Sequence, residues 1–173
     1  LLKDRAFWRK SLEFLLVPLF FTLAVELITT PAFKIIFDEL VLSSTGQFMH
    51  FDRFAARASS SDSLANHFIL QDAFVVKRPF FFPFLLATLH DILGYDYRNA
   101  FHLNTILTYV YFTLFYLIAR NFANRLISIG ACILTIGLPV FINSSQSGHF
   151  EILNLFMLLS CGLRGYHYLK APS

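Results

Sequence analysis

Long apolar runs, broken only by short polar segments, constrain this chain more than any other feature. Hydrophobic residues make up 56% of the sequence and charged residues 14%, whereas a soluble domain usually carries about 25% charged residues. The 22 phenylalanines among 173 residues exceed what a soluble core of this size uses. The composition therefore predicts an integral membrane protein.

Four of these runs are predicted to cross the membrane as helices, because about 20 apolar residues span the hydrocarbon layer. They lie near residues 12–30, 101–119, 126–142 and 150–163. A fifth run, 79–93, is shorter and contains His90 and Asp91, which is typical of a helix at the membrane surface. The predicted fold is all-α, with a long outer loop over 31–100 that holds this interfacial helix.

The basic residues decide between four spans and five. With four, the N-terminus, the turn containing Arg120 and Arg125, and the C-terminal segment lie together on the cytoplasmic side, as the positive-inside rule favours. If 79–93 also crossed, these residues would move outside. Four spans are therefore preferred. They place the 31–100 loop and the 143–149 turn on the same outer side.

Charge and cysteine usage exclude other classes. The net charge of +3 does not indicate nucleic-acid binding, because most Lys and Arg flank apolar runs. Cys132 and Cys161 lie inside apolar runs and form no metal-type pattern. The chain starts at Leu1 and stops at Ser173 with no evident terminal domain, so we expect one transmembrane region belonging to a longer catalytic unit.

An acidic pair, Asp38 and Glu39, begins eight residues after the first predicted span. A carboxylate at the membrane surface acts as a general base toward an acceptor hydroxyl or amine, or it binds a divalent cation that neutralises a phosphate. A solvated helix face or a helix N-terminal charge explains the same pair. Glu26, inside the first span, either lines an interior cavity or lies near the interface.

Two further segments carry chemistry. Lys77-Arg78-Pro79 precedes an aromatic run, which fits a lipid phosphate and a groove for its chain, or ordinary interfacial residues. Ser147–Glu151 reads Ser-Gly-His-Phe-Glu and fits a second acidic site, or an acid at a helix N-terminus. The other histidines share no metal-binding spacing, so we expect them to be structural or interfacial.

The order of these motifs resembles the N-terminal part of the GT-C membrane glycosyltransferases. It resembles in particular the bacterial branch related to dolichyl-phosphate-mannose protein mannosyltransferases and lipid A aminoarabinose transferases. The matching segments cover nearly the whole chain and are Phe37–Glu39, Lys77–Pro83, Gly94, Ala119–Phe122, Leu138-Pro139 and Ser147–Glu151. The chain departs from the family at Arg78-Pro79-Phe80, where members often have a Pro-Pro pair.

The resemblance implies an enzyme that moves a sugar from a polyprenyl-phosphate donor to a lipid, glycan or protein, at the periplasmic face of a bacterial inner membrane. The expected partners are therefore the polyprenyl-phosphate-linked sugar and membrane lipids. The resemblance maps Asp38 onto an acid that activates the acceptor, Glu151 onto a second acid, and Lys77 or Arg78 onto a donor-phosphate contact. Together with the neighbouring residues of these motifs, the predicted catalytic residues are Asp38 and Glu39, and the predicted substrate-binding residues are Lys77, Arg78, His149 and Glu151. A divalent cation is left open, with Asp38 and Glu151 as candidate ligands. The alternative from the residues is a non-catalytic component, such as a lipid-carrier flippase subunit or an assembly scaffold.

Overall fold

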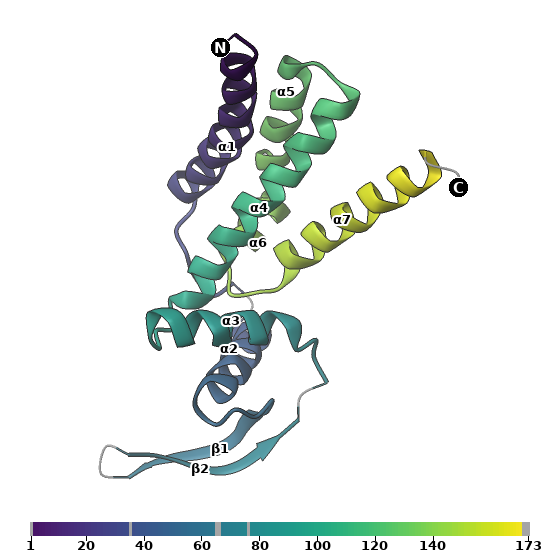
Figure 1. The fold of residues 1–173 in the computed structure, drawn as a ribbon. Coiled ribbons are helices and arrows are strands. Elements are labelled where there is room, and N and C mark those ends of the chain that lie inside the picture. Colours follow the sequence, from purple (N-terminus) through teal and green to yellow (C-terminus); the bar gives the residue numbers. More distant parts are fainter. Residues whose placement is uncertain (1, 35, 65–66, 76, 171–173) are drawn as a thin grey trace. The chain divides into compact units, whose positions relative to one another are not determined.

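The fold is taken from a computed structural model, which describes residues 2–34, 36–64, 67–75 and 77–170 (Figure 1). The described residues form seven helices and one two-stranded sheet. In chain order they are α1 (Leu2–Ile28), α2 (Ile36–Phe51), β1 (Arg57–Leu64), β2 (His67–Phe74), α3 (Phe81–Leu93), α4 (Asn99–Phe122), α5 (Arg125–Ile136), α6 (Pro139–Ser145) and α7 (Glu151–Lys170).

The chain divides into two compact units. Unit 1 comprises Leu1–Pro31, Asn104–Gln146 and Phe150–Ser173, and unit 2 comprises Ala32–Leu103 and Ser147–His149. Unit 1 thus contains the four predicted spans, apart from the first turn of α4. Unit 2 contains the predicted outer loop and three residues of the turn before α7.

In unit 1, α1 and α4 run antiparallel. Glu13, near the middle of α1, accepts a hydrogen bond from Tyr116 in the second half of α4. Glu26, near the end of α1, accepts one from Thr105 in the first half of α4. Between them Phe21 packs on Phe112, with ring centroids 5.6 Å apart. Aromatic packing of this kind stabilises the contact beyond the apolar area it buries.

The predicted spans are confirmed as helices, with one interruption. Among the described residues α4 is the one unbroken helix long and apolar enough to cross a membrane; α5 and α6 together make a second if the bent pair is one span. The predicted 126–142 run bends by 76° between them. Leu138 is extended (φ −84°, ψ 115°) because Pro139 follows it and disfavours helical backbone there.

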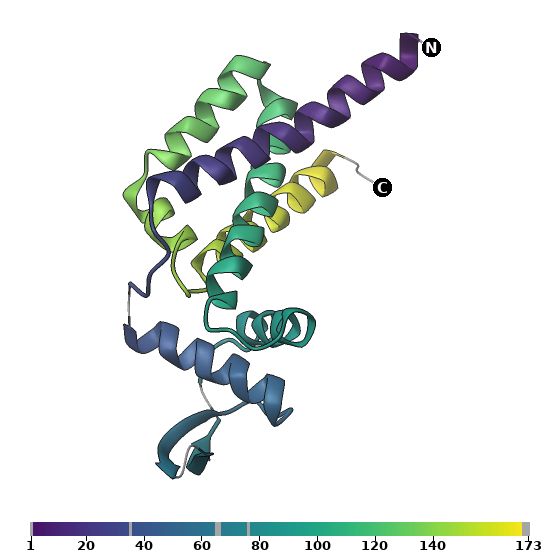
Figure 2. The same ribbon diagram turned by 90° about the vertical axis from the view of Figure 1, so that its left-hand side faces the viewer.

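In unit 2, α2 crosses α3. Figure 2 shows α2 along its length and α3 nearly end-on. A Cβ added at Gly46 would lie 3.0 Å from the Leu86 side chain, so the glycine allows the two helices to approach closely. α3 confirms the predicted short apolar helix over 79–93. The Leu42 and Phe82 side chains are buried in this unit.

The described residues are helical as predicted, apart from one hairpin in the predicted outer loop. In this hairpin the serine-rich β1 pairs antiparallel with β2 from Arg57↔Phe74 to Leu64↔His67. The serines of β1 have no strong strand preference, whereas β2 carries Phe68 and Ile69, which favour strands. Pairing with β2 therefore determines the conformation of β1, and composition alone did not reveal it.

Candidate functional site

Both predicted acids lie in the first turn of α2, where the helix dipole favours negative charge. Their environments differ. The Asp38 side chain is 26% exposed and pairs with Arg78, whereas Glu39 is completely buried. Two neighbouring carboxylates therefore serve two different partners, one at the surface and one inside unit 2.

The Asp38–Arg78 pair joins two predicted motifs that are 40 residues apart. Arg78 Nη2 donates to Asp38 Oδ1, and the Arg78 side chain is 42% exposed. An exposed pair of this kind contributes only about 0.2–1 kcal/mol to stability. Arg has five N–H donors, so Arg78 can bind a phosphate oxygen while it holds the carboxylate. The neighbouring Lys77 is also exposed.

Glu39 binds the turn that precedes α7. The Gly148 N–H donates to Glu39 Oε1 over 2.9 Å, and both residues are buried. Only glycine fits here without a shift of its neighbours, because a Cβ would lie 3.0 Å from the Phe33 ring. A buried carboxylate is costly unless its oxygens are hydrogen-bonded. This bond therefore fixes residues 147–149 to the first turn of α2.

The predicted Gly-His-Phe-Glu site is divided between the two units. His149 is buried in unit 2, and its N–H donates to Ser147 Oγ. Glu151 is the first residue of α7 in unit 1 and accepts a hydrogen bond from Ser144. In the part of the chain that the structure describes, no three His, Cys, Asp or Glu side chains gather to hold a metal ion.

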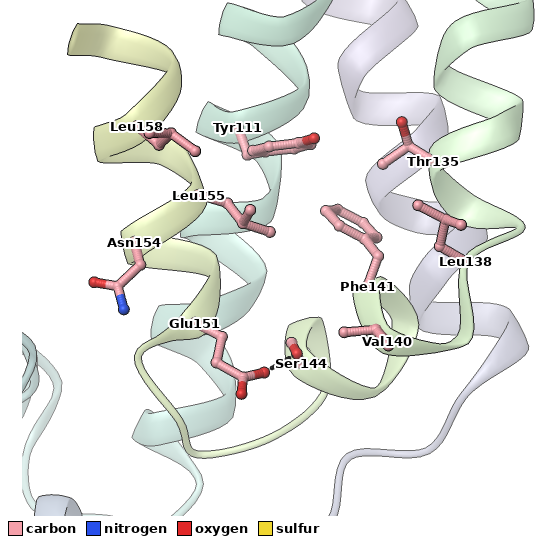
Figure 3. A pocket seen from close by; sticks show the side chains of 10 residues that line it. All are labelled: Tyr111, Thr135, Leu138, Val140, Phe141, Ser144, Glu151, Asn154, Leu155 and Leu158. Atoms are coloured by element: carbon pink, nitrogen blue, oxygen red, sulfur yellow. Dashed lines mark hydrogen bonds between the residues drawn. The ribbon is translucent and has the colours of Figure 1, made fainter. Parts of the chain in front are cut away.

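Glu151 also lines a cavity of about 470 Å³ in unit 1 (Figure 3). The cavity lies where α4, the α5–α6 bend and α7 meet. The Glu151 and Ser144 side chains meet at one end. The rest of the lining is mostly apolar, and its other polar members are Tyr111, Thr135 and Asn154. Glu151 was predicted from the sequence, but the cavity was not. The cavity depends on the bend between α5 and α6, whereas the 126–142 run was predicted to be one continuous span.

A second polar cluster in unit 2 was not predicted. Asp91 Oδ1 lies 2.6 Å from His50 Nδ1, and Asp91 Oδ2 accepts from Arg53 over 2.6 Å. The Arg53 hydrogen bond lowers the pKa of Asp91. Asn99 Nδ2 lies 2.9 Å from His90 Nδ1 and donates to that ring nitrogen. Burial, and secondarily the charge of His50, lowers the pKa of His90.

This cluster ties the ends of α2 and α3 together with the start of α4. His50 lies in the last turn of α2, and His90 lies in the last turn of α3. A search for histidines in a shared local spacing misses such a group, because its members come from separate helices. The signal available in the sequence was two apolar helices that each carry a histidine in the last turn.

Glu26, whose place the sequence left open, lies inside unit 1. Its Oε1 accepts from Thr105 and, over 2.7 Å, from Gln146. The residue therefore links α1, α4 and the end of α6. Nearer the middle of α1, Glu13 Oε1 lies 3.6 Å from Nε of both Arg120 and Arg125.

Comparisons with known proteins leave the family open: no family model, no curated protein and no solved structure matches this chain. The GT-C resemblance therefore stays a prediction from the order of the motifs in the sequence.

Proposed function

We propose that this chain is the N-terminal part of a membrane glycosyltransferase that moves a sugar from a polyprenyl-phosphate donor to an acceptor on the non-cytoplasmic side. One observation carries the proposal. Two consecutive acids, Asp38 and Glu39, bind the other two motifs, through Arg78 and through Gly148. The first two motifs and residues 147–149 of the third thereby lie together in unit 2.

The antiparallel arrangement of α1 and α4 supports the four-span topology. If the 79–93 segment crossed the membrane, 12–30 and 101–119 would run parallel. Glu13 next to Tyr116 and Glu26 next to Thr105 require the opposite direction. The four-span order also puts Glu39 and Gly148 on one side of the membrane, as their hydrogen bond needs.

In the proposed reaction, Lys77 and Arg78 bind the phosphate of the donor. Arg78 keeps its hydrogen bond to Asp38 Oδ1, and Asp38 Oδ2 serves the acceptor. Asp38 takes the proton of the acceptor hydroxyl or amine while that group bonds to the anomeric carbon. The bond from this carbon to the phosphate oxygen breaks, and its electron pair leaves with the lipid phosphate. General-base help of this kind is worth about 10²–10⁴-fold in rate.

A non-catalytic membrane component is the second candidate, and a specific observation favours it. Asp38 and Glu39 each have a partner within unit 2, so both have a structural role without any substrate. In that case Lys77 and Arg78 would contact lipid phosphates only. The protein would act as a lipid-carrier flippase subunit or an assembly scaffold.

Sugar transfer by the full-length protein in proteoliposomes separates the two candidates. The donors are radiolabelled polyprenyl-phosphate sugars, and release of polyprenyl phosphate is the readout. Asp38→Asn should lower the rate about 10²–10⁴-fold. Asp52→Asn, an exposed change just after α2, should leave it unchanged. Equal rates in Asp38→Asn and wild type, with release above the protein-free blank, would refute the assignment of Asp38. Release at the blank level in wild type would favour the non-catalytic candidate.

A further inference from the structure

The cavity in unit 1 has the size and lining of a ligand site. Its volume of about 470 Å³ lies within the roughly 300–1,000 Å³ typical of small-molecule pockets. Protein interiors are otherwise close-packed. The α5–α6 bend creates the space, because Pro139 turns α6 away from the line of α5. A cavity that arises from a bent backbone, and not from a missing side chain, persists in the folded protein.

The apolar side chains that line the cavity favour contact with a hydrocarbon chain. Leu138, Val140 and Leu158 line the cavity and are 58%, 76% and 70% exposed. Glu151 and Leu158 are seven residues apart on α7, which corresponds to about 10 Å along the helix. An alkyl chain of medium length covers that distance and packs against these side chains.

The polar end selects the head group. The Ser144 hydroxyl donates to the Glu151 carboxylate at one end of the cavity (Figure 3). A carboxylate accepts up to about four hydrogen bonds and donates none when ionised, so a further partner at this end must be a donor. An amine or a hydroxyl meets this requirement, whereas an ionised carboxylate or phosphate head would be repelled.

We propose that this cavity binds the hydrocarbon chain of a single-chain amphiphile whose head group is an amine or a hydroxyl. The chain lies against Leu138, Leu155 and Leu158, and the head donates to Glu151. This site differs in charge preference from the proposed donor site, whose Lys77 and Arg78 attract a phosphate. It does not depend on the chain being an enzyme.

Photo-crosslinking of the full-length protein in lipid nanodiscs tests the proposal. The probes are dodecylamine, dodecanol and dodecanoate, each with a diazirine in the chain, and labelled peptides are mapped by mass spectrometry. Labelling of the α6 and α7 peptides by the amine and the alcohol should exceed that by dodecanoate about tenfold. Equal labelling by all three probes would overturn the proposal.

Matched variants separate cavity binding from general lipid contact. Leu155→Trp and Val140→Trp each place a large ring in the cavity and should abolish the labelling. Leu126→Trp, on an exposed position of α5 outside the lining, should not. Glu151→Gln should retain labelling by the alcohol and remove the discrimination against dodecanoate, because an amide also donates. Labelling that survives both cavity-filling changes would refute the site.

Discussion

The two units hold their carboxylates in different ways. In unit 2, Asp38 and Asp91 pair with arginines that are 42% and 69% exposed. In unit 1, Glu26 and Glu151 accept from neutral groups, namely a threonine, a glutamine and a serine. Glu13 of unit 1 combines the two modes, because it accepts from a tyrosine and lies 3.6 Å from two arginines. Exposed ion pairs exchange partners at small cost, whereas hydrogen bonds among apolar helices are harder to replace. We therefore expect charge-dependent chemistry in unit 2, and packing or ligand selection in unit 1.

Glu39 is the exception in unit 2, since it is buried, and its loss should have the largest effect on stability. Glu39→Ala removes the acceptor of the Gly148 N–H and should destabilise unit 2 by about 1–3 kcal/mol. Glu39→Gln retains an acceptor oxygen and should cost less. Hydrogen exchange of the α2 and 147–149 peptides in nanodiscs measures the difference. Equal protection in both variants and wild type would show that this bond does not fix the turn.

Glu26 provides the matching test in unit 1. Glu26→Ala removes the acceptor shared by Thr105 and Gln146 and should cost about 1 kcal/mol, as interhelical hydrogen bonds in membranes do. Glu26→Gln, which keeps an oxygen at the position, is the control. Thermal unfolding of both variants in detergent measures the cost. An alanine variant as stable as wild type would contradict the linking role of Glu26.

The Asp38–Arg78 pair should matter less for stability than either buried acid. Arg78→Gln should change the unfolding free energy by about 0.2–1 kcal/mol, because the pair is exposed. The same change should weaken binding of polyprenyl-phosphate vesicles, and Arg98→Gln, also in an exposed position, should not. A loss of stability as large as that of Glu39→Ala would show that the pair is structural.

The smallest expected effect is a dependence on pH from His90. Since burial lowers the pKa of His90 in the folded protein, the unfolded chain takes up a proton first as the pH falls below 6.5. Stability of unit 2 is therefore complete above pH 6.5 and decreases as the pH falls through the lowered pKa. The Asp91 contribution is lost only below pH 3.8. Unfolding of His90→Gln, followed from pH 8 to pH 5, should depend less on pH than unfolding of the wild type, and an equal dependence would contradict the role of His90.

Local pattern predicted the helices well because apolar runs of helical length leave few alternatives. Pro139 marked the bend in the sequence, but the surrounding apolar residues concealed it. The hairpin was missed because its first strand is rich in serine and forms only by pairing with the second.

The candidate site was predictable in its members but not in its contacts. Asp38 and Arg78 are each recognisable by residue type and position, yet their pairing depends on how the outer loop folds back. The difference between Asp38 and its neighbour Glu39 was also hidden, because burial depends on which face of α2 meets Gly148. The cavity beside Glu151 needed the bend, and therefore the tertiary structure.

The central claim is that residues 147–149, which precede α7, contact the first residues of unit 2, and that both segments lie on the same side of a membrane. Phe33→Cys with Gly148→Cys, in full-length protein lacking Cys132 and Cys161, tests this directly, because the two positions are in contact. A short bifunctional thiol reagent added to intact membranes should crosslink the pair. Absence of crosslinking, with the two single cysteines labelled from opposite sides of the membrane, would contradict the account.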